Sequence, residues 1–336
     1  MSSSSSPLLR VASIPLVSRR GDAAWNVARV AACLADAAGQ NIGLAVFPES
    51  CLTGYASMAK LSRVELDGLA ESIEGPSIRA VTEAVERTGV AAGVGFVERA
   101  ADGRLFNSYV VCLPGGQRHG HRKLHAFEHR RMSNGDRFTV FDTSWGMRVG
   151  ILIGADNYLV ENVRMTALMG ATLLIAPHRS FGARSAGALQ MQPVSFEQAR
   201  RGKSTRHAPN DRTLGDPYRW LPARAADNGL FIAFSDGAHV ADDTAALGTG
   251  MIVDPDGRML ALNTETTNTL FSADIEADRT TTSAGSQWLG ARRPDLYGPL
   301  SRPDNRLTTN LEPASRSPRG SIAVSFAQVG RNRLTG

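Results

Sequence analysis

Short apolar runs alternate with amphipathic segments along the first half of the chain. Residues 8–17 and 42–47 are apolar runs of strand length, and run 42–47 is continuous, as is typical of strands covered on both faces. Between them, residues 23–38 place apolar side chains at helical spacing, namely Val27, Val30, Ala31 and Leu34. This order predicts strands joined by helical crossovers.

The same patterns predict further elements along the rest of the chain. Helices are expected at 64–72, 77–87, 161–169 and 220–227, and strands at 89–97, 105–113, 147–153, 171–176, 230–234 and 270–275. Residues 248–253 and 258–262 flank the turn Pro255-Asp256-Gly257, which predicts a hairpin. Crossovers followed by hairpins favour an α/β fold in which two layers of sheet are covered by helices.

Three segments lack these patterns. Residues 1–7 are a serine-rich N-terminus that we expect to be disordered, and they do not have the basic and apolar regions of a secretory signal. Residues 179–215 are rich in Arg, Ser, Gly, Gln and Pro, which predicts a long surface insertion. From about Thr280 the chain is rich in Arg, Ser and Pro, so we expect an extended tail. Within it, residues 303–336 would suit an oligomerisation arm beyond a single domain at 8–302.

Composition and charge narrow the class of protein. The 336 residues contain 37 Lys and Arg against 32 Asp and Glu, an excess of +5 that is too small and too scattered to predict nucleic-acid binding. There is no apolar stretch of membrane-spanning length, so we expect a cytoplasmic protein that does not bind membranes. The three cysteines, Cys33, Cys51 and Cys112, have neither CxxC spacing nor a histidine cluster, which argues against zinc or a disulfide framework.

A few charged residues stand where chemistry is often found. Glu49 comes directly after the apolar run 42–47, and a carboxylate at a strand end points into the cleft at the sheet edge. Lys123 lies in the segment GHRKLHAFE, and Glu128 follows five residues later. The strand predicted at 147–153 ends in Gly-Ala-Asp-Asn. Each residue alone is equally well explained as a solvated surface group.

Together and in this order, these residues resemble the nitrilase superfamily of carbon–nitrogen hydrolases, in its amidase-like branch. The resemblance covers about residues 8–300. It rests on FPESCLTGY (47–55), RKLHAFE (122–128), RVGILIGADNYLVENVRMTALMGATLLIAP (148–177), PARAADNGLFI (222–232) and GTGMIVDPDGRMLA (248–261). It implies a four-layer α-β-β-α sandwich that needs no metal or organic cofactor and assembles as a homodimer or larger homo-oligomer.

The resemblance also implies roles for matching residues. The family uses a Glu–Lys–Cys triad, in which Glu49 would be the general base and Lys123 the cation beside the tetrahedral intermediate. Glu128 would orient the lysine or the substrate amide. The substrate is further expected to contact residues around the turn and its neighbouring loops, namely Tyr55, Ala155, Asp156 and His178.

The main departure from the family pattern is the nucleophile. The turn that should carry the cysteine is Ile153-Gly154-Ala155-Asp156, so glycine stands at the nucleophile position. Glycine cannot attack a carbonyl, and removing a nucleophile from such a unit lowers the rate by orders of magnitude. Cys51 follows Glu49 closely, but we expect it to be a small core residue, as we do Cys33 and Cys112.

Two explanations fit Gly154. One is an engineered replacement of cysteine, and the other is a natural pseudoenzyme that binds or regulates. We favour the first because the other site residues, Glu49, Lys123, Glu128 and Asp156, are all present.

With a cysteine at position 154, the expected reaction is hydrolysis of a small linear amide through a thioester. Nitrilases in the narrow sense carry a Trp-Glu pair after the cysteine where this chain has Ala155 and Asp156, and Glu128 likewise favours an amide. N-carbamoyl compounds and nitriles remain alternative substrates.

Overall fold

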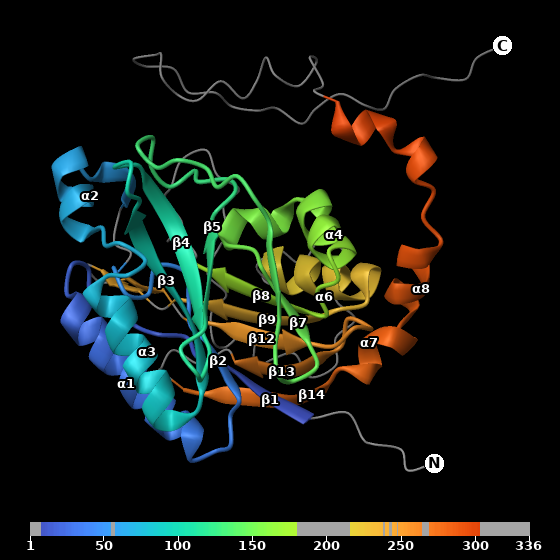
Figure 1. The fold of residues 1–336 in the computed structure, drawn as a ribbon, viewed down its shortest axis with the longest axis horizontal. Coiled ribbons are helices and arrows are strands. Elements are labelled where there is room, and N and C mark those ends of the chain that lie inside the picture. The colour runs from blue at the N-terminus through green and yellow to red at the C-terminus, as the bar shows by residue number, and fades with distance from the viewer. Residues whose placement is uncertain are drawn as a thin grey trace. The chain divides into compact units, whose positions relative to one another are not determined.

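Two six-stranded mixed sheets form the centre of the fold in the computed structural model (Figure 1). The structure describes residues 8–54, 58–179, 216–237, 239–241, 244–246, 248–263 and 269–302. The first sheet has the order β14 (Phe271–Glu276), β1 (Leu8–Ser13), β2 (Leu44–Val46), β3 (Ala91–Arg99), β4 (Leu105–Cys112) and β5 (Arg118–Arg122). The second has the order β13 (Met259–Asn263), β12 (Gly250–Val253), β9 (Phe231–Asp236), β8 (Leu173–His178), β7 (Arg148–Ile151) and β6 (Thr139–Asp142).

The two sheets share one plan, with parallel strands at the centre and antiparallel strands at the edges. Strands β1, β2 and β3 run parallel, as do β7, β8 and β9. The remaining neighbours in both sheets pair antiparallel. A separate two-stranded ladder joins β10 (His239–Ala241) to β11 (Thr244–Ala246). The central parallel strands place their carboxyl ends, and the loops that follow them, where α/β proteins commonly build sites.

Helices cover the outer face of each sheet (Figure 1). Helices α1 (Ala23–Ala38) and α3 (Pro76–Thr88) lie on the first sheet, and α4 (Val160–Leu168) and α6 (Asp216–Asn228) lie on the second. The shorter helix α2 (Arg63–Leu69) and the 3₁₀ turn η1 (Met58–Lys60) precede α3. The predicted four-layer α-β-β-α sandwich is therefore confirmed.

Alternation along the strands divides the apolar residues between the layers. Leu44 and Val46 of β2 pack between the two sheets, whereas Ala45 faces the core under α1 and α3. In β8, Leu173 and Ile175 pack between the sheets and Leu174 faces the helices of the other side. Because side chains alternate along a strand, a strand that is covered on both faces reads as a continuous apolar run.

Several elements differ from the predictions, and strand β6 and the β10–β11 ladder were not predicted at all. Strand β1 ends at Ser13 and not at Val17. Strand β5 was not predicted because its sequence, RHGHR, is polar. The extended tail predicted from Thr280 is wrong for its first part, because residues 278–290 form α7 (Asp278–Thr282) and α8 (Ala284–Gly290).

Helix α8 depends on a close approach to α6. Ser283 caps it by accepting a hydrogen bond from the backbone of Ser286. Gly285 lies so near the backbone of Ala226 and Gly229 that a Cβ there would overlap both. A polar local sequence does not predict a helix that is stabilised by tertiary packing of this kind.

The chain divides into two compact units, residues 1–292 and 293–336. The described part of the second unit contains two 3₁₀ turns, η3 (Pro294–Leu296) and η4 (Gly298–Ser301). The serine-rich residues 1–7, residues 180–215 of the predicted insertion and the predicted arm at 303–336 lie outside the described residues. Among the helices that the structure describes, none has both the length and the apolar character to cross a bilayer.

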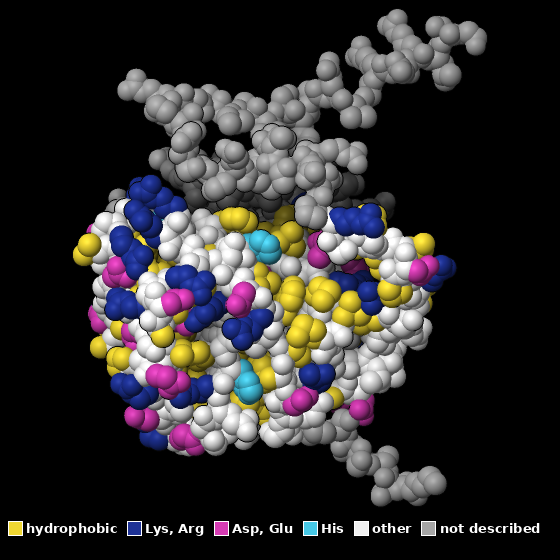
Figure 2. Space-filling model, turned by 45° about the horizontal axis from the view of Figure 1, so that its top comes forward, with side chains coloured by type: hydrophobic (Ala, Val, Ile, Leu, Met, Phe, Trp, Pro, Cys, Tyr) yellow, Lys and Arg dark blue, Asp and Glu magenta, His cyan; other side chains and the backbone are white. Residues whose placement is uncertain are grey.

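Basic and acidic side chains lie among one another on the face seen in Figure 2. Exposed ion pairs of the described residues include Arg63–Asp67, Arg104–Asp102 and Arg137–Asp136. Exposed pairs of this kind contribute little stability. In each pair the basic side chain is next to an acidic one, so neither sign of charge accumulates there.

Gly95 of β3 allows the turn after β2 to lie against the first sheet. The backbone N–H of Leu52 donates to the Gly95 carbonyl at 2.9 Å, and a Cβ at Gly95 would overlap the backbone nitrogen of Ser50. Ser50 itself has a φ of 52°, in the left-handed region that few residues with a side chain adopt. The turn that carries Glu49 is therefore held in a conformation that needs a glycine beside it.

We expect Gly95→Ala to lower the free energy of unfolding by about 1–3 kcal/mol, because the backbone it would overlap cannot move cheaply. Gly68→Ala in α2 is the control, since a Cβ there would meet nothing within 4 Å. That control should leave stability unchanged or raise it by about 0.5–1 kcal/mol. Urea unfolding measures both, and equal midpoints for the two variants would contradict the account of the turn.

Candidate active site

Glu49 lies in the turn that follows β2 and is buried, with 2% of its surface exposed. Its backbone N–H donates to the carbonyl of His178, at the end of β8, at 3.3 Å. This bond joins a loop of the first sheet to a strand end of the second. The carboxylate is therefore held where the two sheets meet.

Lys123 follows β5 and places its ammonium group between two carboxylates. Its Nζ lies 2.8 Å from Oε1 of Glu49 and also contacts Oε1 of Glu128. All three side chains are buried. A buried charge is tolerated only when it is paired and hydrogen bonded, so these three groups stabilise one another.

Asn107 of β4 completes this cluster. Its Nδ2 donates to Oε1 of Glu49 at 2.6 Å and to Oε1 of Glu128 at 2.9 Å. It was not among the residues predicted from the sequence. The sequence signal that could have found it is a polar residue inside an otherwise apolar strand. The structure buries Asn107 completely.

Gly154 begins the 3₁₀ turn η2 (Gly154–Tyr158) after β7, with a φ of 52°. An ideal Cβ built on it would lie 2.6 Å from Oε2 of Glu49 and 2.8 Å from Nζ of Lys123. Both atoms are at the ends of flexible side chains, so they can withdraw. A side chain at position 154 would point between the carboxylate and the ammonium group.

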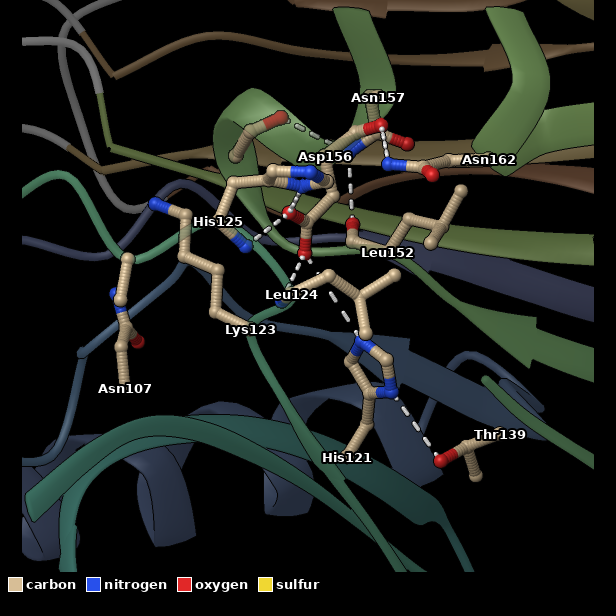
Figure 3. Close-up of polar contacts among 12 residues, drawn as sticks. Asn107, His121, Lys123, Leu124, His125, Thr139, Leu152, Asp156, Asn157 and Asn162 are labelled. Atoms are coloured by element: carbon tan, nitrogen blue, oxygen red, sulfur yellow. Dashed lines mark hydrogen bonds and ion pairs between the residues drawn. The ribbon is translucent and has the colours of Figure 1, made fainter. Parts of the chain in front are cut away.

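Asp156 joins this turn to the segment after Lys123 (Figure 3). Its fully buried carboxylate accepts hydrogen bonds from the backbone N–H groups of Leu124 and His125, both at 2.9 Å. Nδ1 of His125 lies 3.0 Å from the same carboxylate. The Asp156 carboxylate, which we expected to contact substrate, thus accepts hydrogen bonds from the protein. These bonds connect the turn that begins at Gly154 to the segment after Lys123.

Asn157 and His178 lie beside the turn that begins at Gly154. Nδ2 of Asn157 donates to the carbonyls of Leu152 at 2.7 Å and Gly154 at 3.2 Å. The same nitrogen lies 3.2 Å from Nε2 of His178. Burial lowers the pKa of His178 from 6.5 to about 4, so its imidazole is neutral at pH 7.

His121 of β5 is a second buried neutral imidazole near Asp156 (Figure 3). Its Nδ1 lies 3.2 Å from Oγ1 of Thr139, and its Nε2 lies 4.0 Å from the Asp156 carboxylate. Burial lowers its pKa to about 4, although Asp156 acts in the opposite direction.

None of the three cysteines can replace a side chain at position 154. Cys33, Cys51 and Cys112 are all buried, as predicted for core residues. Burial raises the pKa of the Cys51 thiol to about 12, so it stays protonated and unreactive at neutral pH.

The structure thus brings together Glu49, Lys123, Glu128 and position 154. Ala155 follows in η2 and is half-buried. Tyr55 lies outside the described residues. Within the described ranges, no group of three or more His, Cys, Asp or Glu side chains could hold a metal ion.

Comparisons with known proteins identify the family of the chain. The sequence model of the family described as carbon-nitrogen hydrolase matches residues 10–284. An (R)-stereoselective amidase from a Pseudomonas species is 32% identical over 256 residues, which are 75% of this chain and 80% of that protein. A nitrilase from Pyrococcus abyssi is 26% identical over 257 residues, 75% of this chain and 83% of that protein.

Solved structures show the same fold at low sequence identity. A mutant of the Nesterenkonia AN1 amidase from the nitrilase superfamily superposes with a TM-score of 0.64 at 18% identity, covering 87% of this chain and 97% of that one. A mutant of the same amidase in complex with butyramide gives a TM-score of 0.63 at 19% identity, again covering 87% and 97%.

The two buried imidazoles predict how stability depends on pH. The pKa values of His121 and His178 are lowered from 6.5 to about 4 in the folded protein, so between these values the unfolded chain binds more protons. The free energy of unfolding therefore falls as the pH is lowered from 6.5 to 4, by up to about 3 kcal/mol per histidine.

His121→Asn removes one titrating group and should flatten this decline in urea unfolding measured at several pH values. Thr139→Val removes the hydrogen-bond partner of His121 but keeps the imidazole, so it should retain the slope. An unchanged slope in His121→Asn would show that His121 does not contribute.

Proposed function

Because the chain belongs to the carbon–nitrogen hydrolase family, we propose that its site is built to hydrolyse a non-peptide C–N bond of a small linear amide. In this proposal, Gly154 occupies the place of the nucleophile, and the chain as it stands lacks the group that attacks the substrate.

One observation carries the proposal, namely the direction of a side chain at position 154. A Cβ there lies 2.6 Å from Oε2 of Glu49 and 2.8 Å from Nζ of Lys123. A cysteine at this point would have its thiol beside both a base and a cation. That is the arrangement which activates a thiol for attack on a carbonyl.

The proposed reaction then has two halves. Glu49 takes the thiol proton, the thiolate sulfur bonds to the amide carbon, and the C–N bond breaks as Glu49 returns the proton to the leaving ammonia. The product of this half is a thioester. Water then attacks the thioester carbon, Glu49 takes a proton from the water, and the C–S bond breaks to release the carboxylic acid and the thiol.

Lys123 supports both halves. Its ammonium group would lie beside the oxyanion of each tetrahedral intermediate, with the backbone N–H of Ala155 as a second donor. Such donors are worth roughly 3–4 kcal/mol each in other enzymes. Glu128 contacts Nζ of Lys123 from the other side and limits the positions that the ammonium group can take.

Glycine suits the backbone at position 154, whereas cysteine would be strained. The φ of 52° is left-handed, which costs a residue with a side chain roughly 1–2 kcal/mol. Glu49 and Lys123 would also have to withdraw slightly. Strain of this kind often accompanies a catalytic residue.

An amide is the substrate class that the chain favours. Asp156 stands where nitrilases in the narrow sense carry glutamate, and Glu128 matches the second glutamate of many amidases. The amidase from Pseudomonas and the butyramide complex of a structural relative point the same way. N-carbamoyl compounds and nitriles are the alternatives, because the same triad can act on both.

Gly154 itself favours a second candidate function, a natural binding or regulatory protein on a hydrolase scaffold. In that case the cluster of Glu49, Lys123 and Glu128 would bind a small amide without cleaving it. The two candidates differ in what a cysteine at position 154 would do.

Gly154→Cys should release ammonia from at least one member of a panel of small amides, N-carbamoyl compounds and nitriles. We expect at least about a thousandfold more activity than in the unmodified chain, because the nucleophile is the component that is missing. Gly154→Ala is the matched control, since it carries the same backbone strain without a thiol.

Adding Glu49→Gln to Gly154→Cys should remove the activity again, because the thiol loses its base. If Gly154→Cys is silent on the whole panel while calorimetry detects amide binding to the unmodified chain, the binding role replaces the hydrolase role. Equal ammonia release from Gly154→Ala and Gly154→Cys would mean that position 154 does not carry the nucleophile.

A further inference from the structure

We propose that Asn107 is a positioning residue that fixes the plane of the Glu49 carboxylate, so that one of its oxygens faces position 154. This inference rests on the proposed function, because it assigns to Glu49 the part of a base. Asn107 itself lies in β4, is not among the nearest neighbours of a Cβ at position 154, and acts through Glu49.

The two carboxylate oxygens of Glu49 have different neighbours. Oε1 lies within hydrogen-bond distance of both Nδ2 of Asn107 and Nζ of Lys123. Oε2 is the oxygen that lies 2.6 Å from a Cβ at position 154. Two donors on one oxygen hold the carboxylate plane, and the other oxygen is left to take a proton from a side chain at position 154.

Glu128 is held by the same pair of donors. Its Oε1 accepts from Nδ2 of Asn107 at 2.9 Å and contacts Nζ of Lys123. Two buried carboxylates facing one ammonium group repel each other, and the amide of Asn107 bridges them without adding a charge. Without this bridge, the two carboxylates would be free to separate around Lys123.

The amide of Asn107 can point only one way. Its Nδ2 is turned toward the two glutamate oxygens, and its Oδ1 lies at the long distance of 3.4 Å from Oγ of Ser50, which adds weakly to this orientation. A flipped amide would set Oδ1 against two carboxylate oxygens. The backbone carbonyl of Asn107 also accepts from the backbone N–H of Lys123 at 2.8 Å.

Asn107 therefore contacts all three members of the ion cluster, namely Glu49, Glu128 and Lys123. Its backbone carbonyl holds the backbone of Lys123 in place, and its side-chain amide holds the carboxylates of Glu49 and Glu128. Ser50, which adds weakly to the orientation of the amide, is the residue with the left-handed backbone beside Gly95. The unusual turn after β2 thus serves to orient Asn107 as well as to present Glu49.

Alkylation of the introduced cysteine tests this role without knowledge of the substrate. In Gly154→Cys, a thiolate displaces iodide from iodoacetamide, and mass spectrometry of the peptide that contains residue 154 gives the rate constant at pH 7. The unmodified chain is the blank, because its three cysteines are buried.

Asn107→Leu, added to Gly154→Cys, keeps the side-chain volume and removes the donors. We expect the rate constant to fall by about tenfold, the effect of losing a hydrogen bond that orients a charged group. Asn228→Leu is the matched control. Asn228 is also buried, but its Nδ2 donates to the backbone carbonyl of Arg224 within α6. It should leave the rate constant of folded protein within about twofold.

Ser50→Ala is the second variant and covers the case in which Asn107→Leu fails to fold. It removes only the weak contact with the amide, so we expect a smaller fall of about two- to threefold. A purely structural role would reduce the amount of folded protein but would leave the rate constant at residue 154 unchanged in both variants.

The outcomes separate the two proposals. A reactive Gly154→Cys whose rate constant is unchanged by Asn107→Leu and Ser50→Ala overturns the role of Asn107 and leaves the proposed function standing. If Gly154→Cys is alkylated no faster than the same variant carrying Glu49→Gln, Glu49 does not activate the thiol, and both proposals fail. Falls in the expected order, with Asn228→Leu unaffected, support both.

Discussion

The ion cluster of Lys123 with Glu49 and Glu128 is the interaction on which the rest of the site depends. Three ionisable side chains are buried together, and a charge on any of them would be strongly unfavourable there without the others. The cluster therefore requires that the loop after β2, the end of β5 and the loop after Lys123 keep fixed positions relative to one another. The two-sheet sandwich meets this requirement, because both sheets bring strand ends to the same place.

The surrounding backbone is specialised to serve this cluster. Gly95 makes room for the turn of Glu49 and Ser50, and Asp156 binds the backbone beyond Lys123 to the turn that starts at Gly154. Two left-handed residues, Ser50 and Gly154, flank the carboxylate of Glu49 from two different loops. Conformations of this kind persist only where the rest of the fold determines them. For Ser50 this conformation carries a steric cost that glycine at position 154 avoids, and the proposed role of position 154 is consistent with both.

Much of the fold followed from the sequence because strands covered on both faces have a distinctive apolar pattern. Runs such as 42–47 and 171–176 identified central strands, and the order of motifs identified the family. The polar strand β5 and the short helix α8 could not be predicted, because each is stabilised by its neighbours and not by its own pattern. Among the site residues, Glu49, Lys123, Glu128 and Gly154 were predictable from the family motifs. Asn107 and the inward direction of Asp156 were not, since both depend on which strands become neighbours.

The central claim is that position 154 is the point of covalent attack in an amide-hydrolysing site. The most direct test is intact-protein and peptide mass spectrometry of Gly154→Cys, quenched in acid shortly after mixing with small amides. We predict a mass increase equal to the amide less ammonia, located on residue 154, and no such increase in Gly154→Ala. Ammonia release without an acyl group on residue 154, or an acyl group on Cys51 in its place, would contradict the account.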